Sequence, residues 1–372
     1  MIRSLLVAGL CVLVACAPRG QMVYVPQGTS SGPTQTVYVA TTRLFDAEAM
    51  TFGSKRSETA SFARYDIGIP PNRKPGTIGY PRRGAKPDPA TDFVTTAEQF
   101  YPGGATFRRD LASALRQDPS GGREATIFVH GYNNTFGEGV YRIAQLSHDL
   151  ELPGVAMHYS CPSAATPFGY VYDRDSTVFA RNGLEALLRE ASLSGADRIF
   201  LVAHSMGSAL LMETLRQLAV RGDRRTLSKI AGVILISPDV DVEVFRSQAH
   251  DIGKLPEPFV IFGSDRDKAL KLSARLTGQT ARLGSLDNVG AVADLDVTFV
   301  DVAAFNVGGG HFNVGDSAAL IRLLGRIGDV DAAFASDQTG RIGLIPGAVL
   351  TVQNATQIIL QPVAALGLGL QQ

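Results

Sequence analysis

A serine flanked by small residues is the feature of this sequence that most directly suggests chemistry. The stretch Ala203-His204-Ser205-Met206-Gly207 ends the apolar run RIFLVAH and begins the helically spaced run GSALLMETL. A nucleophile on a strand-to-helix turn needs small residues two positions before and after it, because the two backbones pass closely. Ala203 and Gly207 meet this need. Ser205 is therefore the candidate nucleophile, and the alternative is a tight joint that only happens to contain serine.

A serine hydroxyl needs a neighbouring base to become nucleophilic. Of the six histidines, His311 is the candidate base, because the Gly-rich stretch NVGGGHFNVGDS places it on a loop that could reach over a sheet edge. The other histidines are expected to do other work: His204 to point away from Ser205, His130 to support a loop, His158 to pack in a strand, and His148 and His250 to lie on surface helices.

The base in turn needs an orienting carboxylate. Asp267 in FGSDRDKAL is favoured, since it follows an apolar run and opens a helical one, and Asp265 is its close competitor. Asp239 comes next as an alternative, with Asp241, both in ISPDVDVEVF; several of these are expected to be helix caps. The chain order Ser205, Asp267, His311 is that of the α/β-hydrolase fold.

Two amide donors must stabilise the oxyanion of an acyl-transfer intermediate. The backbone N–H of Met206, directly after the candidate nucleophile, is the first. The second is expected from the loop after TIFVH, where Gly131 permits the backbone to turn and Tyr132 donates. The Tyr132 ring is expected to shape the pocket.

These residues need a scaffold that brings distant segments to one edge. Short apolar runs alternate with amphipathic ones from residue 105 onwards, which predicts a mostly parallel sheet covered by helices on both faces. The predicted strands are 36–42, 124–130, 154–160, 198–204, 230–237, 258–264 and 296–302. The predicted helices are 105–117, 137–150, 176–192, 207–220, 267–276 and 317–328. Residues 43–94, rich in Gly, Pro and Arg, are predicted to be an irregular lead-in with one strand around YDIGIP.

The N-terminus has the pattern of a secretory signal. Arg3 precedes an apolar run that ends in Leu13-Val14-Ala15-Cys16, which resembles the lipobox of bacterial lipoproteins. The resemblance implies that residues 1–15 are removed and that Cys16 is lipidated; an ordinary signal peptide with an incidental cysteine is the alternative. By resemblance to the sorting rules of enterobacterial lipoproteins, Ala rather than Asp at position 17 favours the outer membrane, on its periplasmic side.

The remaining organisation follows from composition. Residues 16–35 read as a flexible tether, 36–335 as one α/β-hydrolase domain, and 336–372 as a tail whose structure stays open. Lys plus Arg and Asp plus Glu both total 35, so no basic surplus points to nucleic acid. No phosphate-binding loop or metal-ligand spacing is present, so no cofactor or metal is expected.

Six stretches together resemble a known protein family. VYVATTR, TIFVHGYNNTF, YSCPSAATPFGYVYDRDS, LVAHSMGSALL, SPDVD and GSDRDKAL, spread over residues 36–330, are similar to bacterial α/β-hydrolases of largely unassigned function, which are often lipid-anchored and called esterase- or lipase-like. The resemblance implies the fold and a Ser-Asp-His triad but no substrate. Cys161 stands where the family is expected to have Trp before Pro-Ser, so specificity does not carry over.

The combined hypothesis is a serine hydrolase that cleaves acyl esters of a small molecule or lipid, tethered to a membrane through Cys16. The same triad could serve a thioesterase, an amidase or an acyltransferase. A membrane-anchored hydrolase fold that binds or scaffolds without catalysis is the alternative of another class. A thiol enzyme using Cys161 is a third hypothesis, and the oligomeric state is left open.

Overall fold

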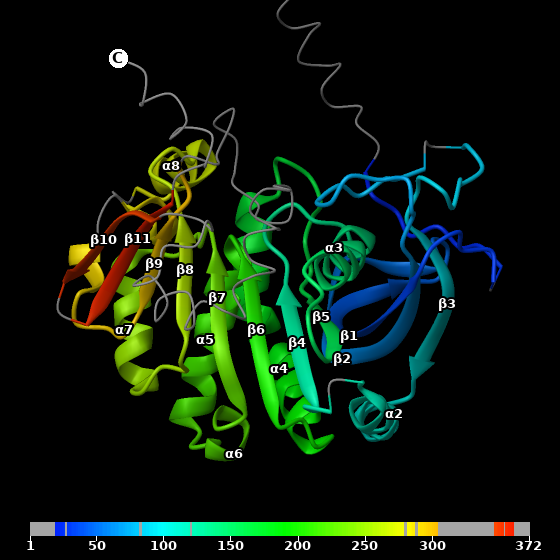
Figure 1. The fold of residues 1–372 in the computed structure, drawn as a ribbon, viewed down its shortest axis with the longest axis horizontal. Coiled ribbons are helices and arrows are strands. Elements are labelled where there is room, and N and C mark those ends of the chain that lie inside the picture. The colour runs from blue at the N-terminus through cyan, green and yellow to red at the C-terminus, as the bar shows by residue number, and fades with distance from the viewer. Residues whose placement is uncertain are drawn as a thin grey trace, which may run out of the picture.

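One sheet organises the chain. The computed structural model describes residues 19–303 without 27, 82–83, 120, 279–280 and 287–288, and residues 346–360 without 353. Its parallel strands are β4 (Glu124–Val129), β5 (Val155–Ser160), β6 (Arg198–His204), β7 (Ile230–Ile236), β8 (Phe259–Gly263) and β9 (Thr298–Asp301). They lie side by side in the order β9-β8-β7-β6-β4-β5, so their carboxyl ends meet at one edge of the sheet, the upper edge in Figure 1.

Helices cover both faces of this sheet, as predicted. Leucine and phenylalanine side chains of α2 (Gly104–Gln117), α4 (Tyr170–Leu193), α5 (Met206–Val220) and α7 (Val242–Ile252) share one apolar core with the strands. The opposite face of β1 (Thr34–Asp46), β4 and β5 packs on α3 (Phe136–Asp149). α8 (Lys268–Leu276) lies at the carboxyl edge (Figure 1), and the short elements α6 (Arg224–Leu227), η1 (Leu283–Ser285) and η2 (Val289–Val292) complete the described helices. The fold is that of an α/β-hydrolase.

The prediction of an irregular lead-in over residues 43–94 is wrong for residues 43–68, whereas the described part of 69–93 contains no helix or strand, as predicted. β1 (Thr34–Asp46) continues past residue 43 and pairs antiparallel with β2 (Thr51–Gly68), which pairs in turn with β3 (Val94–Tyr101). Many outward positions of β2 carry charged or small polar side chains, which hide the apolar alternation that marks a strand. β1 joins this antiparallel part to the parallel part through β5.

The far edge of the sheet is built from the C-terminal segment. β10 (Pro346–Val352) and β11 (Ala355–Leu360) form an antiparallel hairpin, and β11 pairs parallel with β9. The predicted domain end at residue 335 is therefore too early, because part of the predicted tail belongs to the sheet. The predicted helix 317–328 lies outside the described residues.

The predicted tether is docked on the domain over its first described residues. Arg19 and Gly20 bond to Glu138 at the start of α3, Val23 N–H donates to the Tyr141 hydroxyl at 3.0 Å, and Tyr24 forms a β-bridge with Thr95. These polar contacts are made with residues more than seventy positions away, so the composition of residues 16–35 did not reveal them. Among the helices of the described residues, none is long and apolar enough to span a membrane.

Candidate active site

Ser205 stands on the turn between β6 and α5. Its backbone has φ 53° and ψ −123°, a region that a residue with a side chain adopts only when its surroundings enforce it. The enforcement is visible: Ser205 N–H donates to Ile236 O at 2.9 Å, and its carbonyl accepts from Ser208 N–H at 3.0 Å and Asp239 N–H at 3.1 Å. Ser205 is held in the strained turn that a nucleophile elbow requires.

Small residues let this turn approach the neighbouring strand. A Cβ at Gly207 would lie 2.4 Å from the carbonyl oxygen of His130, and one at Gly131 would lie 2.8 Å from the Cβ of Ser205. The elbow therefore touches the β4–α3 loop (residues 130–135), from which the second oxyanion donor was predicted.

The β4–α3 loop presents an uncommitted amide. Asn133 N–H donates to Asp173 Oδ2 at 2.9 Å and Asn134 N–H to Ser163 Oγ at 3.2 Å. Within the described part of the chain, the amides of Tyr132 and Met206 donate to no acceptor. Met206 opens α5, where the first amides of a helix have no partner inside the helix. Both predicted oxyanion donors are thus available beside Ser205.

A fully buried arginine supports the loop from below. Arg43 Nη2 donates to the carbonyl of Asn134 at 2.8 Å, Nη1 to Gly53 O at 3.2 Å, and Nε to Ser160 Oγ at 2.9 Å. Burial lowers the Arg43 pKa to about 10, which still leaves the guanidinium charged at neutral pH. Sequence reasoning did not single out Arg43; its only signal was its place in the VYVATTR stretch.

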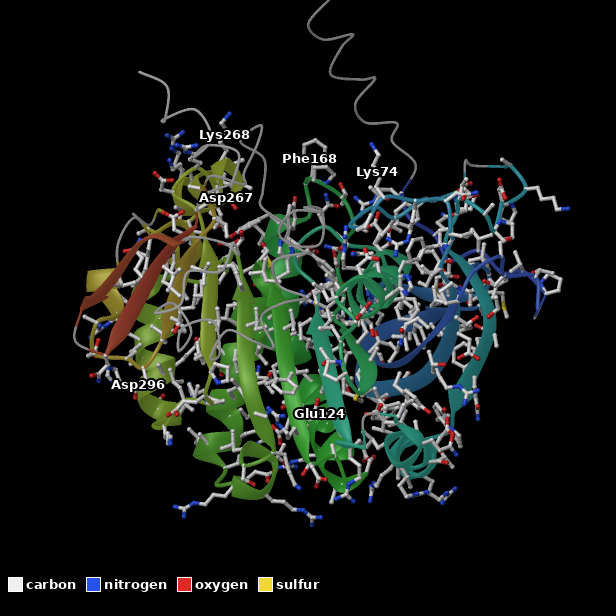
Figure 2. The ribbon with its side chains drawn as sticks, in the orientation of Figure 1. Lys74, Glu124, Phe168, Asp267, Lys268 and Asp296 are labelled. Atoms are coloured by element: carbon white, nitrogen blue, oxygen red, sulfur yellow. The ribbon has the colours of Figure 1, made fainter. Side chains whose placement is uncertain are left out.

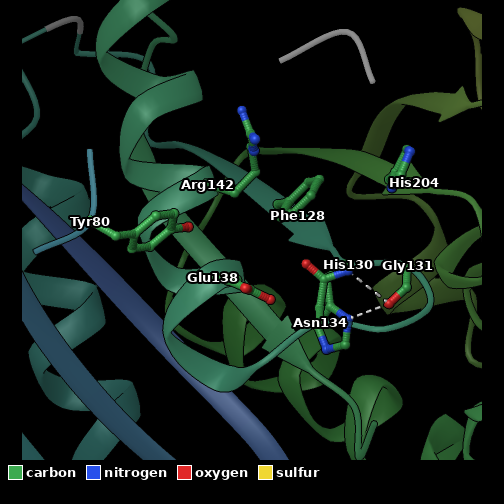
Figure 3. A pocket seen from close by; sticks show the side chains of 8 residues that line it. All are labelled: Tyr80, Phe128, His130, Gly131, Asn134, Glu138, Arg142 and His204. Atoms are coloured by element: carbon green, nitrogen blue, oxygen red, sulfur yellow. Dashed lines mark hydrogen bonds between the residues drawn. The ribbon is translucent and has the colours of Figure 1, made fainter. Parts of the chain in front are cut away.

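His130 sits beside Arg43 and supports the loop, as predicted from its position. Its Nδ1 is 2.8 Å from the carbonyl oxygen of Gly131, which also accepts from the Asn134 side chain at 3.2 Å (Figure 3). Burial, and then the charge of Arg43, lower the pKa of His130 to about 3. His130 is therefore a neutral, buried side chain that supports the loop through hydrogen bonds.

The other four described histidines lie in different surroundings. His158 is buried, bonds to Phe128 O at 2.9 Å and has its pKa lowered by burial, while His250 is exposed and 3.2 Å from Asp294. His148 is exposed on α3. His204 points into a cavity of about 240 Å³ that Ser205 does not line (Figure 3). His311 lies outside the described residues, on the chain that follows β9.

The two carboxylate candidates have different surroundings. Asp267 follows β8 and is fully buried, and its Oδ1 caps α8 by accepting from Ala269 and Leu270 N–H at 3.0 and 3.1 Å. Because β9 lies beside β8, the chain that leads to His311 departs from the same edge as Asp267. This placement favours Asp267 as the orienting acid.

Asp239 is engaged elsewhere. Its Oδ1 accepts from Ser273 Oγ at 2.6 Å and lies 3.1 Å from Arg282 Nε, and its Oδ2 accepts from the Tyr170 hydroxyl at 3.0 Å. Both side chains of the Asp239–Arg282 ion pair are 4% exposed. Asp241 caps α7, and Asp265 is exposed. Asp239 therefore serves a buried ion pair next to the elbow.

Two further observations limit the chemistry. Burial raises the pKa of the Cys161 thiol to about 12, so this cysteine stays protonated and the hypothesis of a thiol enzyme is unsupported. Among the described residues, no three His, Cys, Asp or Glu side chains are grouped to hold a metal ion.

A groove lies beside Tyr170, the tyrosine that packs against Tyr132. Tyr132 and Tyr170 pack edge to face with 5.5 Å between ring centroids, and Tyr170 borders this groove, which has a volume of about 390 Å³. Phe168, Val171 of α4 and Leu276 of α8 are among its lining residues. Tyr132 itself does not line this groove and touches it through Tyr170, so the role predicted for the Tyr132 ring in a substrate pocket stays a prediction.

Comparison with known proteins agrees with this fold. The family described as "alpha/beta hydrolase of unknown function (DUF900)" matches residues 105–326, more than half of the chain. A comparison with curated proteins finds no match.

Solved structures with some similarity include three hydrolases. An inhibited esterase B from Lactobacillus rhamnosis is 12% identical, with 83% of this chain and 91% of that one covered and a TM-score of 0.36. An alpha-beta serine hydrolase homologue from Coxiella burnetii is 18% identical, with 54% of this chain and 84% of that one covered and a TM-score of 0.32. A fungal esterase from Rhizomucor miehei is 13% identical, with 74% of this chain and 81% of that one covered and a TM-score of 0.35. At these scores the likenesses carry no argument about activity.

Proposed function

Because the chain belongs to the DUF900 family of α/β-hydrolases, we propose that it is a serine hydrolase that cleaves carboxylic acyl esters through an acyl-enzyme on Ser205. The observation that carries the proposal is a strained serine at the elbow together with two uncommitted amides, that of Met206 at the same turn and that of Tyr132 on the adjoining β4–α3 loop. A serine in a purely structural turn has no need for donors arranged around it.

The proposed reaction has two halves. His311, oriented by Asp267, takes the proton of the Ser205 hydroxyl as Oγ bonds to the ester carbonyl carbon. The amides of Met206 and Tyr132 stabilise the oxyanion, the C–O bond to the alcohol breaks, and His311 returns the proton to the departing alcohol oxygen. Water then attacks the acyl-enzyme with His311 as base, which releases the carboxylic acid and restores Ser205.

We also propose that the protein is a lipoprotein acylated on Cys16 and held at the outer membrane, on its periplasmic side. The lipobox-like stretch that ends at Cys16 supports this. More than one acyl chain is needed for a stable anchor, which lipoprotein modification would provide. The mass of the mature N-terminal peptide tests this part of the proposal directly.

An active-site-directed fluorophosphonate tests the catalytic part. The parent protein should be labelled, and Ser205→Ala and His311→Ala should not. Ser228→Ala, at an exposed serine beside α6, is the matched control and should label like the parent. An unlabelled parent, or a Ser205→Ala variant that labels normally, would contradict the proposal. A panel of p-nitrophenyl esters, thioesters and anilides then identifies the acyl bond that is cleaved.

A further inference from the structure

The first described residue of the chain is fixed to the loop that carries Tyr132. Arg19 Nη1 and Nη2 donate to the side-chain and main-chain oxygens of Asn133, both at 2.7 Å, and Nη2 also reaches Glu138 Oε2 at 2.7 Å. The next residue is held too, since Gly20 N–H donates to Glu138 Oε1 at 3.0 Å and its carbonyl accepts from Thr135 Oγ1 at 2.6 Å.

This attachment limits how far the edge can be from a membrane anchor. Only three Cα-to-Cα steps separate Cys16 from Arg19, and fully extended chain covers at most about 11 Å in three steps. Acyl chains on Cys16 would therefore enter the bilayer close to the β4–α3 loop. The length of the tether, together with the place where it attaches, selects which edge of the molecule faces the lipid.

The helix at this edge has the composition of an interfacial helix. α8 buries Leu270, Ser273 and Ala274 but leaves Leu272 56% exposed and Leu276 65% exposed. Its charged residues are all cations, and they are exposed: Lys268, Lys271 and Arg275. An exposed apolar stripe flanked by cations is typical of helices that lie in the headgroup region of an anionic bilayer.

Other exposed apolar side chains belong to the same edge. Phe168 is 97% exposed and Val171 is 70% exposed, and both line the groove that Leu276 closes on the other side. Figure 2 shows Phe168, Lys268 and Lys74 along the edge that carries Asp267, while Glu124 and Asp296 lie at the opposite edge. A single exposed apolar residue is ordinary, but Phe168, Val171 and Leu276 lie around one groove, and exposed apolar side chains gathered in this way mark an interaction surface.

We propose that the carboxyl edge of the sheet docks on an anionic phospholipid bilayer, with Phe168, Leu272 and Leu276 in the headgroup region and the cations of α8 among the lipid phosphates. The short link to Cys16 holds the molecule in this orientation. The groove lined by Phe168 and Leu276 then lies at the edge that faces the lipid. The docking rests on the acylation proposed for Cys16 and is independent of esterase activity.

Fluorescence quenching by the lipid tests the orientation. The full chain, processed and acylated in cells, is reconstituted in vesicles of phosphatidylethanolamine and phosphatidylglycerol that contain a doxyl-labelled quencher lipid. A maleimide dye is attached to Phe168→Cys or Leu272→Cys. Cys161 is buried and its raised pKa keeps it unreactive, so it does not compete for the dye. Both labelled proteins should lose most of their emission in these vesicles.

Val220→Cys is the matched control. Val220 is an exposed apolar residue, 67% accessible, at the last turn of α5, and α5 runs from the elbow to the opposite edge of the sheet. Its dye should keep its emission. Equal quenching at the two edges, or no quenching at residues 168 and 272 in acylated protein, overturns the docking, as does a mature chain without acylated Cys16. Loss of fluorophosphonate labelling alone concerns the proposed catalysis and leaves the docking result unchanged.

Discussion

Arg43 Nη2 lies 2.8 Å from the carbonyl oxygen of Asn134, so a fully buried guanidinium holds the loop that presents the amide of Tyr132. No described carboxylate is within ion-pair distance of Arg43. Its hydrogen bonds go instead to carbonyl oxygens of the β4–α3 loop and of β2 and to the hydroxyl of Ser160. Burying a charged group costs free energy. Because the hydrogen bonds of this buried guanidinium go to the loop carbonyl and its neighbours, we infer that the position of the loop matters to function.

Replacing Arg43 by Met should therefore impair turnover more than substrate binding. We expect kcat/KM to fall by about 10- to 100-fold through kcat, because a displaced loop misplaces the Tyr132 amide. Steady-state ester hydrolysis measures this split. Arg56→Met is the control, since Arg56 bonds to Ser176 and Tyr172 on α4. An equal loss of kcat in both variants would assign Arg43 a purely structural role.

Gly207→Ala should destabilise the fold at the elbow. The added Cβ would lie 2.4 Å from His130 O and 2.7 Å from Val129 O, and backbone atoms must move to accept it. We expect the free energy of unfolding to drop by about 1–3 kcal/mol. At Gly53 the nearest atoms are 3.7 Å away, so Gly53→Ala should change the free energy by about 0.5 kcal/mol or less. Urea unfolding of both variants gives the comparison, and similar values would refute the tight contact.

Asn substitutions separate the two acid candidates. Asp267→Asn keeps a side chain that can cap α8 but removes the charge that would orient His311, so kcat should fall by about 10³- to 10⁴-fold with little loss of stability. Asp239→Asn leaves the buried Arg282 charge without its partner and should cost about 3–5 kcal/mol of stability. Activity assays and urea unfolding of both variants, side by side, settle the assignment. The reverse pattern would identify Asp239 as the acid.

The free energy of unfolding should fall at acidic pH because of His130. Its pKa is about 3 when folded and about 6.5 in an unfolded chain, so the unfolded state binds the proton first as the pH falls. Its contribution to stability is complete above about pH 6.5 and declines towards pH 3, by up to about 2 kcal/mol between pH 6.5 and 5.

Unfolding by urea at pH 7 and pH 5 measures this decline. His130→Gln should flatten the pH dependence, whereas His250→Gln, at an exposed position, should leave it as in the parent. His158 is also buried with a lowered pKa, so the flattening in His130→Gln should be partial. Parallel curves for the parent and His130→Gln would show that this ring does not control acid stability.

Local patterns were enough to predict most of the scaffold. The alternation of apolar strands and amphipathic helices from residue 105 to 302 depends on neighbouring side chains, and the structure has these elements nearly where they were expected. Parts of β1 and β2 were predicted as strands, but their full length and their pairing were missed, because strand formation there depends on pairing across the sheet while the outward residues are polar. The β10–β11 hairpin was missed because it also depends on pairing across the sheet: each β11 residue pairs with a β9 residue 58 positions earlier.

The candidate site also has a part that local sequence predicts and a part that depends on tertiary contacts. The sequence by itself determined the elbow at Ser205, because small residues around a strained turn are a local requirement. Only the tertiary structure decided that Arg43 holds the β4–α3 loop, that Asp239 is paired with Arg282, and that Arg19 attaches the N-terminus beside the active-site edge. Each of these is a contact between a charged side chain and a residue distant in the chain, and the partner of each charge is decided when folding brings those segments together.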